Sequence, residues 1–376
     1  MTVTETLARL VSIDSVSSRS NAEIIRLLSG RCEAMGLTAK RFPYADENGI
    51  EKINMVALAG ADFSDATNVE LALVGHTDTV PYDPNWTEAT TLINREGKLF
   101  ARGSCDTKGF IAAALTAVES MDLKSLRQPL ALIFTADEEV GLMGAKHLVE
   151  ARPLRAHYGI VGEPTSLQPM RAGKGYCLAE IIVRGREGHS AYPALGASAI
   201  FRAARVIVRL EQIAEDLKAG RHELFDPPYT TLNIGVIRGG TAKNVIAGEC
   251  RFTLEWRPIP GQLSNYPLDL LQKALEEEKK LDPDFECEVI ASRADSGFEV
   301  PADSGIVRLV ERLSGKRAGT VAFGTEAAQM IELGADVVVM GPGNIRVAHQ
   351  TGEFVPIDQL DRCVQILGQA IEFACF

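Results

Sequence analysis

Short apolar runs that alternate with helical patterns constrain the fold of this chain more than any other feature. Residues 69–75, 130–135 and 158–161 are brief and almost wholly apolar, which is typical of strands covered on both faces. Between these runs, residues 108–121 and 141–151 favour helices. Strands that alternate with helices in this way indicate an α/β layer.

The alternation returns at the C-terminal end, whereas the middle of the chain follows a different pattern. Residues 303–313, 325–333 and 357–374 favour helices, and residues 336–340 favour a strand. In the middle we expect four strands and two helices, at residues 178–183, 231–237, 251–256 and 285–290 and at residues 198–217 and 268–280. We therefore expect an α/β domain of residues 1–173 and 291–376, interrupted by an α+β domain of residues 174–290.

Charge and hydropathy exclude several classes of partner. The 376 residues include 39 Lys and Arg against 50 Asp and Glu, which gives a formal net charge of −11. This acidic balance argues against nucleic acid and against an anionic membrane surface, because both require clustered basic residues. The longest apolar stretches, 109–118 and 129–136, are shorter than the roughly 20 residues that span a bilayer.

The cysteines and the N-terminal residues indicate in which cellular compartment the protein is expected. Seven cysteines are scattered through the chain without a close pair, which fits neither a disulfide framework nor a thiolate zinc site. Residues 1–18 lack both the basic start and the apolar core of a secretory signal. We expect a cytoplasmic protein whose mature chain starts at this N-terminus.

Acidic and imidazole side chains gather at the predicted ends of the strands, where open α/β sheets usually hold their ligands. They are His76, Asp78, Asp106, Glu138, Glu139, Glu163 and His349. Taken singly, Asp106 also fits a helix N-cap, and the others fit loop or turn residues beside proline or glycine. Two histidines with several carboxylates and no thiolate suit a hydrolytic pair of Zn²⁺ ions that share one bridging carboxylate.

Five spaced blocks of sequence carry a family resemblance. Residues 76–81, 103–109, 137–141, 162–165 and 348–353 closely resemble the dizinc amidohydrolases of the M20 peptidase group. The resemblance implies two zinc ions per subunit, with Co²⁺ as an alternative metal. It assigns His76 and Glu163 to one ion, Glu139 and His349 to the other, and Asp106 to both. It also implies that Asp78 orients His76 and that Glu138 is the general base.

The resemblance further implies an architecture and an assembly. We expect a zinc-peptidase-like catalytic domain with a mixed sheet flanked by helices, and a ferredoxin-like insertion that mediates a homodimer. His189, within the block 188–191, would reach the active site of the neighbouring subunit and help to hold the oxyanion. The residues alone leave a second interpretation open, in which this block is a capping segment served by Ser190 or Ser198.

Substrate recognition depends on fewer residues. By resemblance, Asn244, Arg257, Gly324 and Thr325 contact the substrate, and Arg257 suits a bidentate grip on an α-carboxylate. Arg257 also fits a surface charge on a strand. The blocks 323–327 and 341–344 look more like the deacetylases of this group than the desuccinylases. The resemblance therefore implies hydrolysis of N-acetyl-L-ornithine in arginine biosynthesis.

Several alternatives remain at this point. A desuccinylase, an aminoacylase or a carboxypeptidase would use the same chemistry on another substrate, and a noncatalytic dimeric binding protein could keep the fold. Residues 350–352 read Gln-Thr-Gly before Glu353, where the deacetylases usually carry proline and aspartate, so the exact substrate is open. The chain has neither a complete nucleotide-binding fingerprint nor a serine nucleophile elbow.

Overall fold

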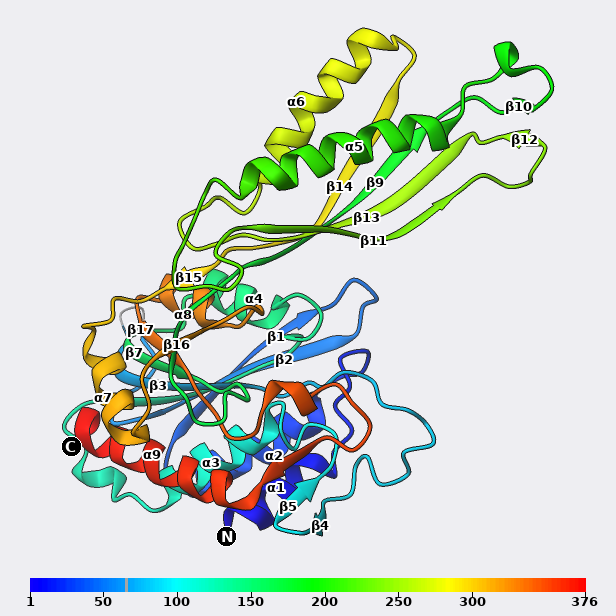
Figure 1. Cartoon of the computed structure of the whole chain (residues 1–376). Coiled ribbons are helices and arrows are strands. Elements are labelled where there is room, and N and C mark those ends of the chain that lie inside the picture. Colours follow the sequence, from blue (N-terminus) through cyan, green and yellow to red (C-terminus); the bar gives the residue numbers. More distant parts are fainter. Residues whose placement is uncertain (65–66) are drawn as a thin grey trace. The chain divides into compact units, whose positions relative to one another are not determined.

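The computed structural model describes residues 1–64 and 67–376, which form two compact units (Figure 1). The first unit comprises residues 1–171, 300–319 and 325–376, and the second comprises residues 172–299 and 320–324. The sequence predicts that the insertion, and the last strand in it, end at residue 290. That strand, β14 (Glu286–Asp295), continues to Asp295, and the chain leaves the second unit after Glu299.

A mixed sheet forms the centre of the first unit, as the sequence predicted. Its order is β1-β2-β6-β3-β7-β17-β8, and β15 (Phe298–Glu299) and β16 (Gly319–Val321) also pair with β8. The strands span Thr38–Ala45 (β1), Glu51–Ala59 (β2), Asn68–His76 (β3), Leu130–Thr135 (β6), Arg155–Val161 (β7), Met170–Gly173 (β8) and Asp336–Val339 (β17). β3 runs parallel to β6 and β7, and β17 runs parallel to β7, whereas β1, β2 and β6 pair in antiparallel fashion.

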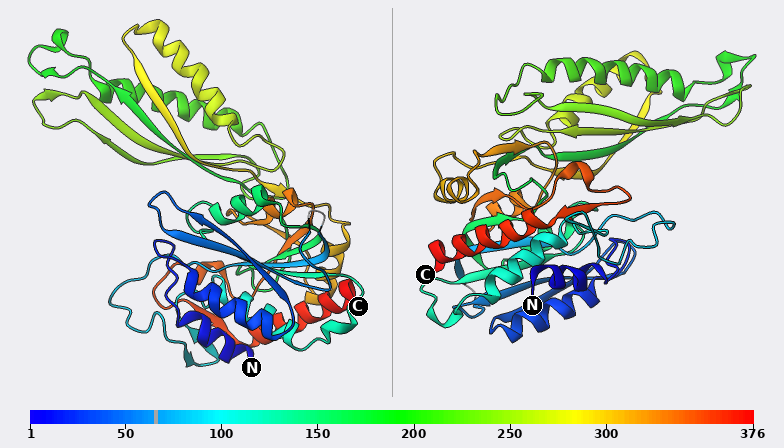
Figure 2. Two further views of the ribbon diagram at one scale, coloured as in Figure 1. Left: turned by 180° about the vertical axis from the view of Figure 1, so that it is seen from behind. Right: turned by 60° about the horizontal axis from the view of Figure 1, so that its bottom comes forward.

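Helices cover this sheet. The helices α1, α3 and α9 contact one another, α7 packs on α9 and β17, α2 packs on β1 and β2, and α4 packs on α8 and β2 (Figure 2). They span Val3–Val11 (α1), Ala22–Ala34 (α2), Lys108–Glu119 (α3), Met143–Ala151 (α4), Gly305–Ser314 (α7), Ala327–Glu332 (α8) and Ile357–Cys375 (α9). A small separate sheet joins β18 (Phe354–Pro356), β5 (Lys98–Phe100) and β4 (Ile93–Arg95). Helices on a buried, partly parallel sheet explain why its central strands are continuous apolar runs.

Local sequence fixes the start of α1. The hydroxyl of Thr2 accepts a hydrogen bond from the Glu5 backbone N–H at 3.2 Å, and the Glu5 carboxylate accepts from the Thr2 backbone N–H at 2.8 Å. This reciprocal capping box satisfies two donors that a helix start leaves free. Leu7 and Leu10 then point into the core, where they are fully buried.

The second unit has the ferredoxin-like order that the sequence predicted. Its elements follow β-α-β-β-α-β along the chain, and the sheet order is β11-β13-β9-β14 with antiparallel neighbours. They span Tyr176–Arg184 (β9), Ala199–Leu217 (α5), Thr231–Gly239 (β11), Glu249–Arg257 (β13) and Tyr266–Leu281 (α6), before β14. The core between the sheet and its two helices includes Ile181, Val206, Leu210 and Trp256. No helix among residues 1–64 and 67–376 has the length and apolar character needed to cross a bilayer.

Candidate metal centre

Four of the predicted site residues of the first unit lie at the carboxyl ends of neighbouring parallel strands. His76 is the last residue of β3, Glu138 and Glu139 follow β6, and Glu163 follows β7. Because these strands run parallel, their carboxyl ends meet at one edge of the sheet. The helix-cap alternative for Asp106 is wrong, since the N-cap of α3 is Thr107.

Asp106 joins the two histidines. Its Oδ1 lies 3.1 Å from Nε2 of His76, and its Oδ2 lies 3.1 Å from Nε2 of His349. Nε2 of His349 is also 3.1 Å from Oε2 of Glu139. Ligand atoms of His76, Asp106 and Glu139 all lie within 4.8 Å of one another. One carboxylate between two imidazoles is the arrangement that a carboxylate shared by two metal ions requires.

Among residues 1–64 and 67–376, two further carboxylates at this edge lack a hydrogen-bond partner for their side chains. Neither Glu138 nor Glu163 forms a hydrogen bond or an ion pair with another side chain among the described residues. Glu163 is only 4% exposed. Burial, followed by the charges of Asp106 and the other glutamate, raises the pKa of Glu163 well above its ordinary value. Burial and the charges of Glu139 and Asp106 do the same to the pKa of Glu138.

Hydrogen bonds to the histidines compensate part of this negative charge. Burial alone would lower the pKa of His76, but hydrogen bonds to Asp106 and Asp78 outweigh it and raise that pKa well above its usual value. Hydrogen bonds to Asp106 and Glu139 raise the pKa of His349 to about 10. Both shifts have the same cause, which is that the carboxylates of this edge favour positive charge beside them.

The donor set fits divalent metal ions. Two imidazoles and several carboxylates without a cysteine ligand are typical of hydrolytic zinc sites. Cys105, beside Asp106, is 1% exposed, and burial raises the pKa of its thiol well above the ordinary value, so it resembles a small core residue. Carboxylates held this close are costly unless protons or cations neutralise them. The residues present thus suit a metal pair.

Asp78 supports both sides of the centre. Its backbone oxygen lies 3.1 Å from Nδ1 of His76, whereas its carboxylate Oδ1 is 3.6 Å from the same nitrogen. The carboxylate also accepts from the backbone N–H groups of Glu138 at 3.2 Å and Glu139 at 3.3 Å, and from the Ser17 hydroxyl at 2.8 Å. Asp78 therefore fixes the turn that carries both glutamates, in addition to its contact with His76.

Glu353 is a residue whose role sequence reasoning missed. Its side chain is completely buried, and Oε1 accepts from the backbone N–H groups of Cys105 at 2.9 Å and Asp106 at 3.0 Å. Oε2 pairs with Arg102, which is also buried. The sequence block 348–353 drew attention to Glu353, but no local signal links it to residue 106. The contact fixes the backbone that carries Asp106.

A second buried ion pair anchors the turn after β6. Nζ of Lys52 lies 2.8 Å from Oδ1 of Asp137, and both side chains are almost fully buried. The Tyr44 hydroxyl donates to Oδ2 of Asp137 at 2.8 Å. Asp137 has a φ of 53°, in the left-handed region. The turn that presents Glu138 and Glu139 is thus anchored through the residue before them.

In the second unit, two of the predicted site residues lie side by side. β10 (Gly188–His189) pairs with β12 (Val245–Ile246), so His189 faces Val245, next to Asn244. The Ser190 backbone N–H donates to the Asn244 oxygen at 3.1 Å. The alternative in which the block 188–191 caps α5 does not hold for Ser190, because the cap of α5 is Ser198. His189 is exposed.

The remaining predicted substrate residues occupy different positions. Arg257 ends β13, and its Nη1 donates to the Ala322 backbone oxygen at 3.1 Å. Gly324 belongs to the second unit, whereas Thr325 belongs to the first. The Thr325 hydroxyl accepts from the Ala327 backbone N–H at 3.3 Å, so it helps to start α8.

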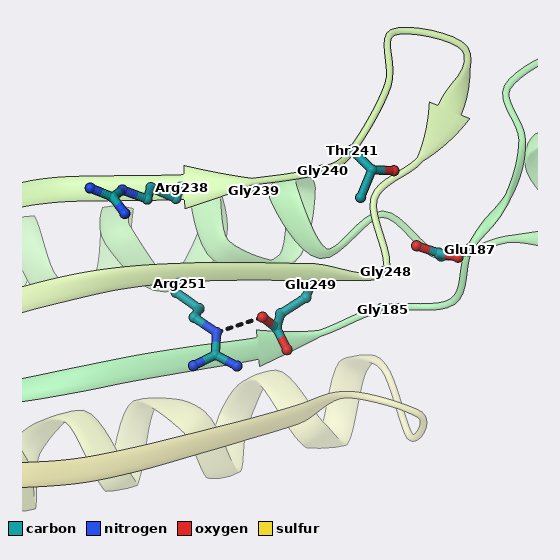
Figure 3. A pocket seen from close by; sticks show the side chains of 9 residues that line it. All are labelled: Gly185, Glu187, Arg238, Gly239, Gly240, Thr241, Gly248, Glu249 and Arg251. Carbon is teal, nitrogen blue, oxygen red and sulfur yellow. Dashed lines mark hydrogen bonds and ion pairs between the residues drawn. The ribbon is translucent and has the colours of Figure 1, made fainter.

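Two pockets are lined by residues of the second unit alone. Figure 3 shows one of about 480 Å³, where Arg251 already pairs with Glu249. Another, of about 750 Å³, is lined by neighbours of His189 and Asn244, including Ser190, Lys243 and Val245. None of the predicted site residues lines the pocket in Figure 3.

Comparison with known proteins identifies the family. The model of "Peptidase family M20/M25/M40" matches residues 72–372, which include the whole cluster around Asp106. The chain belongs to this peptidase family. It is 52% identical over 375 residues to "Acetylornithine deacetylase" of Myxococcus xanthus, covering 98% of this chain and 97% of that relative. It is 36% identical over 365 residues to "Acetylornithine deacetylase" of Proteus mirabilis (strain HI4320), covering 96% of this chain and 92% of the relative.

Solved structures share the fold of this M20 family member. A tripeptidase from Staphylococcus aureus superposes with a TM-score of 0.80 at 23% identity, covering 99% of this chain and 97% of that one. A dinuclear metal-binding peptidase of the M20 family from Bacillus subtilis has a TM-score of 0.66 at 12% identity, covering 99% and 97%. The predicted family and fold are confirmed, and the chain is a hydrolytic enzyme that acts on amide bonds.

Proposed function

We propose that this enzyme is a metal-dependent deacetylase that hydrolyses N-acetyl-L-ornithine to L-ornithine and acetate, a step of arginine biosynthesis. The observation that carries the proposal is the position of Asp106 between His76 and His349, with Glu139 beside them. Similarity to relatives named acetylornithine deacetylase over nearly the whole chain supports the choice of substrate.

In this proposal, two ions bind per subunit. His76 and Glu163 hold one, Glu139 and His349 hold the other, and Asp106 contacts both. The 3.1 Å contacts of Asp106 with both histidines support the sharing. Zn²⁺ is the proposed metal, with Co²⁺ as the alternative, because imidazole and carboxylate ligands suit both. The bound pair would supply Lewis-acid activation of a water molecule and of the amide carbonyl.

Glu138 is the proposed general base and acid. Its carboxylate has no hydrogen bond or ion pair to hold it within the described part of the chain, and its raised pKa suits a group that gains and loses a proton. A carboxylate oxygen of Glu138 takes a proton from the attacking water as the water oxygen bonds to the acyl carbon. The carbon–nitrogen bond then breaks, and Glu138 returns the proton to the departing amine.

The second unit is the proposed dimerisation domain. Phe201 and Val208 on α5 and Val236 on β11 are 74%, 62% and 51% exposed. Large apolar side chains exposed in one unit support a protein interface. We propose a homodimer in which His189 acts at the active site of the partner subunit and Asn244 contacts substrate. All seven cysteines are free, which supports a reducing compartment, and we propose the cytoplasm.

A substrate panel tests this proposal. The protein is first dialysed against a chelator and then loaded with two equivalents of Zn²⁺. Its activity is assayed as amine release. The panel contains N-acetyl-L-ornithine, N-acetyl-L-citrulline, N-acetyl-L-methionine and N-succinyl-diaminopimelate. The proposal predicts metal-restored activity that is highest on N-acetyl-L-ornithine. A higher specificity constant on another member would replace the substrate, and activity that survives metal removal would refute the metal-dependent chemistry.

A further inference from the structure

A buried lysine connects the turn after β6 to the N-terminal part of the chain. Lys52 lies on β2 and is 1% exposed. Its Nζ donates to the backbone oxygen of Ser17, to that of Arg19 at 3.0 Å and to Oδ1 of Asp137 at 2.8 Å. Oδ2 of Asp46 lies farther away, at 3.9 Å. Because an ammonium group has three hydrogens, the three nearer acceptors use all of them and fix its orientation.

Ser17 connects this lysine to Asp78. The Ser17 backbone oxygen accepts from Lys52, and its hydroxyl donates to Oδ2 of Asp78 at 2.8 Å. Oδ1 of Asp78 in turn accepts from the Glu138 backbone N–H at 3.2 Å. Asp137, the other partner of Lys52, directly precedes Glu138 in the chain. These contacts close a ring, which we call the lysine ring and which consists of Lys52, Ser17, Asp78, Glu138 and Asp137.

The side chains of the lysine ring are buried. Ser17 is 6% exposed, and Asp78 and Asp137 are each 2% exposed. Hydrogen bonds are electrostatically stronger away from water than in it. The left-handed backbone of Asp137, with a φ of 53°, is a strained conformation that persists where surrounding contacts hold it. The bond from Lys52 to the Asp137 carboxylate is one such contact.

The segment that carries Ser17 pairs with the segment that follows β3. The Thr79 backbone N–H donates to the Ser15 oxygen at 3.1 Å, and the Ser17 backbone N–H donates to the Thr79 oxygen at 3.0 Å. Asp78 lies directly before Thr79, and its backbone oxygen is 3.1 Å from Nδ1 of His76. The lysine ring therefore connects the turn after β6 to the end of β3, where His76 lies.

We propose that Lys52 and Ser17 are positioning residues for amide hydrolysis, because the lysine ring holds the Glu138 backbone at a fixed place relative to His76. The inference rests on the proposed function, in which Glu138 is the general base and His76 holds a metal ion. Lys52 acts through Asp137, and Ser17 acts through Asp78. A displacement of about 1 Å in a catalytic group can lower a rate by about 100-fold. Opening the ring therefore lowers kcat more than it changes KM.

Ser17→Ala opens the ring with the smallest change. It removes the hydroxyl that donates to Asp78 and keeps the backbone oxygen that accepts from Lys52. Ser304→Ala is the matched control. Ser304 is 8% exposed, and its hydroxyl donates to Oδ2 of Asp336 at 2.7 Å. Because Asp336 begins β17, it lies at the edge of the sheet opposite to the carboxyl ends of the strands.

The assay measures amine release per zinc-loaded chain, on the amide of the substrate panel that wild type hydrolyses fastest. We expect Ser17→Ala to lower kcat about 10- to 100-fold with little change in KM, and Ser304→Ala to match wild type. Lys52→Met opens the ring at a second place. Since an open ring has little more to lose, Ser17→Ala is expected to lower kcat less than about twofold further in the Lys52→Met background.

Equal kcat in Ser17→Ala and Ser304→Ala overturns the inference. Losses that multiply in full when Ser17→Ala and Lys52→Met are combined also overturn it. Should Lys52→Met fail to fold, the comparison of the two serine variants decides by itself.

The proposed function fails separately, if Glu138→Gln keeps wild-type turnover or if wild type hydrolyses no amide of the panel. Hydrogen exchange in EDTA then decides on the lysine ring. The backbone N–H group of Glu138 is expected to exchange about 10-fold faster in Ser17→Ala than in Ser304→Ala, because its acceptor Asp78 is no longer held. Equal exchange rates in the two variants overturn the inference.

Discussion

Replacement of Glu353 by glutamine tests whether a buried ion pair supports the backbone around Asp106. The variant keeps a carbonyl oxygen that can accept from the backbone N–H groups of Cys105 and Asp106, as Oε1 of Glu353 does. It removes the negative charge that pairs with Arg102. Because the volume and one acceptor are conserved, the change isolates the charge of Glu353.

The burial of this pair sets the expected magnitude. The side chains of Arg102 and Glu353 are 5% and 0% exposed. Removing one partner of such a pair typically costs about 3–5 kcal/mol, because the remaining charge stays buried without compensation. The Trp86 ring, 5.5 Å from Cζ of Arg102, offers some stabilisation. We therefore expect a loss near the lower end, about 3 kcal/mol.

An exposed pair of the same residue types provides the control. Arg95 and Glu88 lie 2.9 Å apart, with side chains that are 59% and 44% exposed. Exposed ion pairs contribute about 0–1 kcal/mol, so Glu88→Gln is expected to lose less than about 1 kcal/mol. The contrast between the two variants thus measures the effect of burial on an otherwise similar interaction.

Urea unfolding in EDTA measures both losses without metal binding. The chain contains two tryptophans, Trp86 in the first unit and Trp256 in the second. In a Trp256→Phe background, fluorescence of Trp86 reports the unit that contains Arg102 and Glu353. Equal free-energy losses for Glu353→Gln and Glu88→Gln would refute the reasoning, as would a loss below about 1 kcal/mol for Glu353→Gln.

Three further predictions concern the base, the thiols and the interface. Glu138→Gln is expected to keep its bound metal, by elemental analysis, and to lose about 10²–10⁴ in kcat; wild-type turnover would exclude the base role. Burial raises the pKa of the Cys32 and Cys287 thiols to about 12. In the native chain, a thiol reagent at pH 8 should therefore modify no cysteine other than Cys287, which is half-buried. After unfolding, the same reagent should modify all seven cysteines. Phe201→Glu should convert a dimer to a monomer in sedimentation; an unchanged mass would place the interface elsewhere.

Apolar patterns in the sequence were sufficient to predict the buried strands but not the more exposed elements. The continuous apolar runs of β3 and β6 predicted those strands to within one residue at each end. β1 was not predicted because it alternates exposed and half-buried residues and contains Pro43, a residue suited to an edge strand. The helix α1 was also missed, although the spacing of Thr2 and Glu5 is a capping-box signal.

The site was predicted where ligands follow strands and missed where contacts are distant in sequence. His76, Glu139 and Glu163 are recognisable because each ends or follows a strand of one sheet. Glu353 contacts the backbone of Cys105, which lies 248 residues earlier in the sequence. A hydrophobic periodicity cannot predict a contact between residues so far apart in the sequence.

Metal stoichiometry tests the central claim most directly. Elemental analysis is made on wild type and on Asp106→Ala after zinc loading and dialysis, with circular dichroism to confirm that both are folded. The account predicts two zinc ions per chain in wild type and fewer than one in Asp106→Ala, because the shared carboxylate contributes to both sites. Two tightly held ions in folded Asp106→Ala would contradict the account.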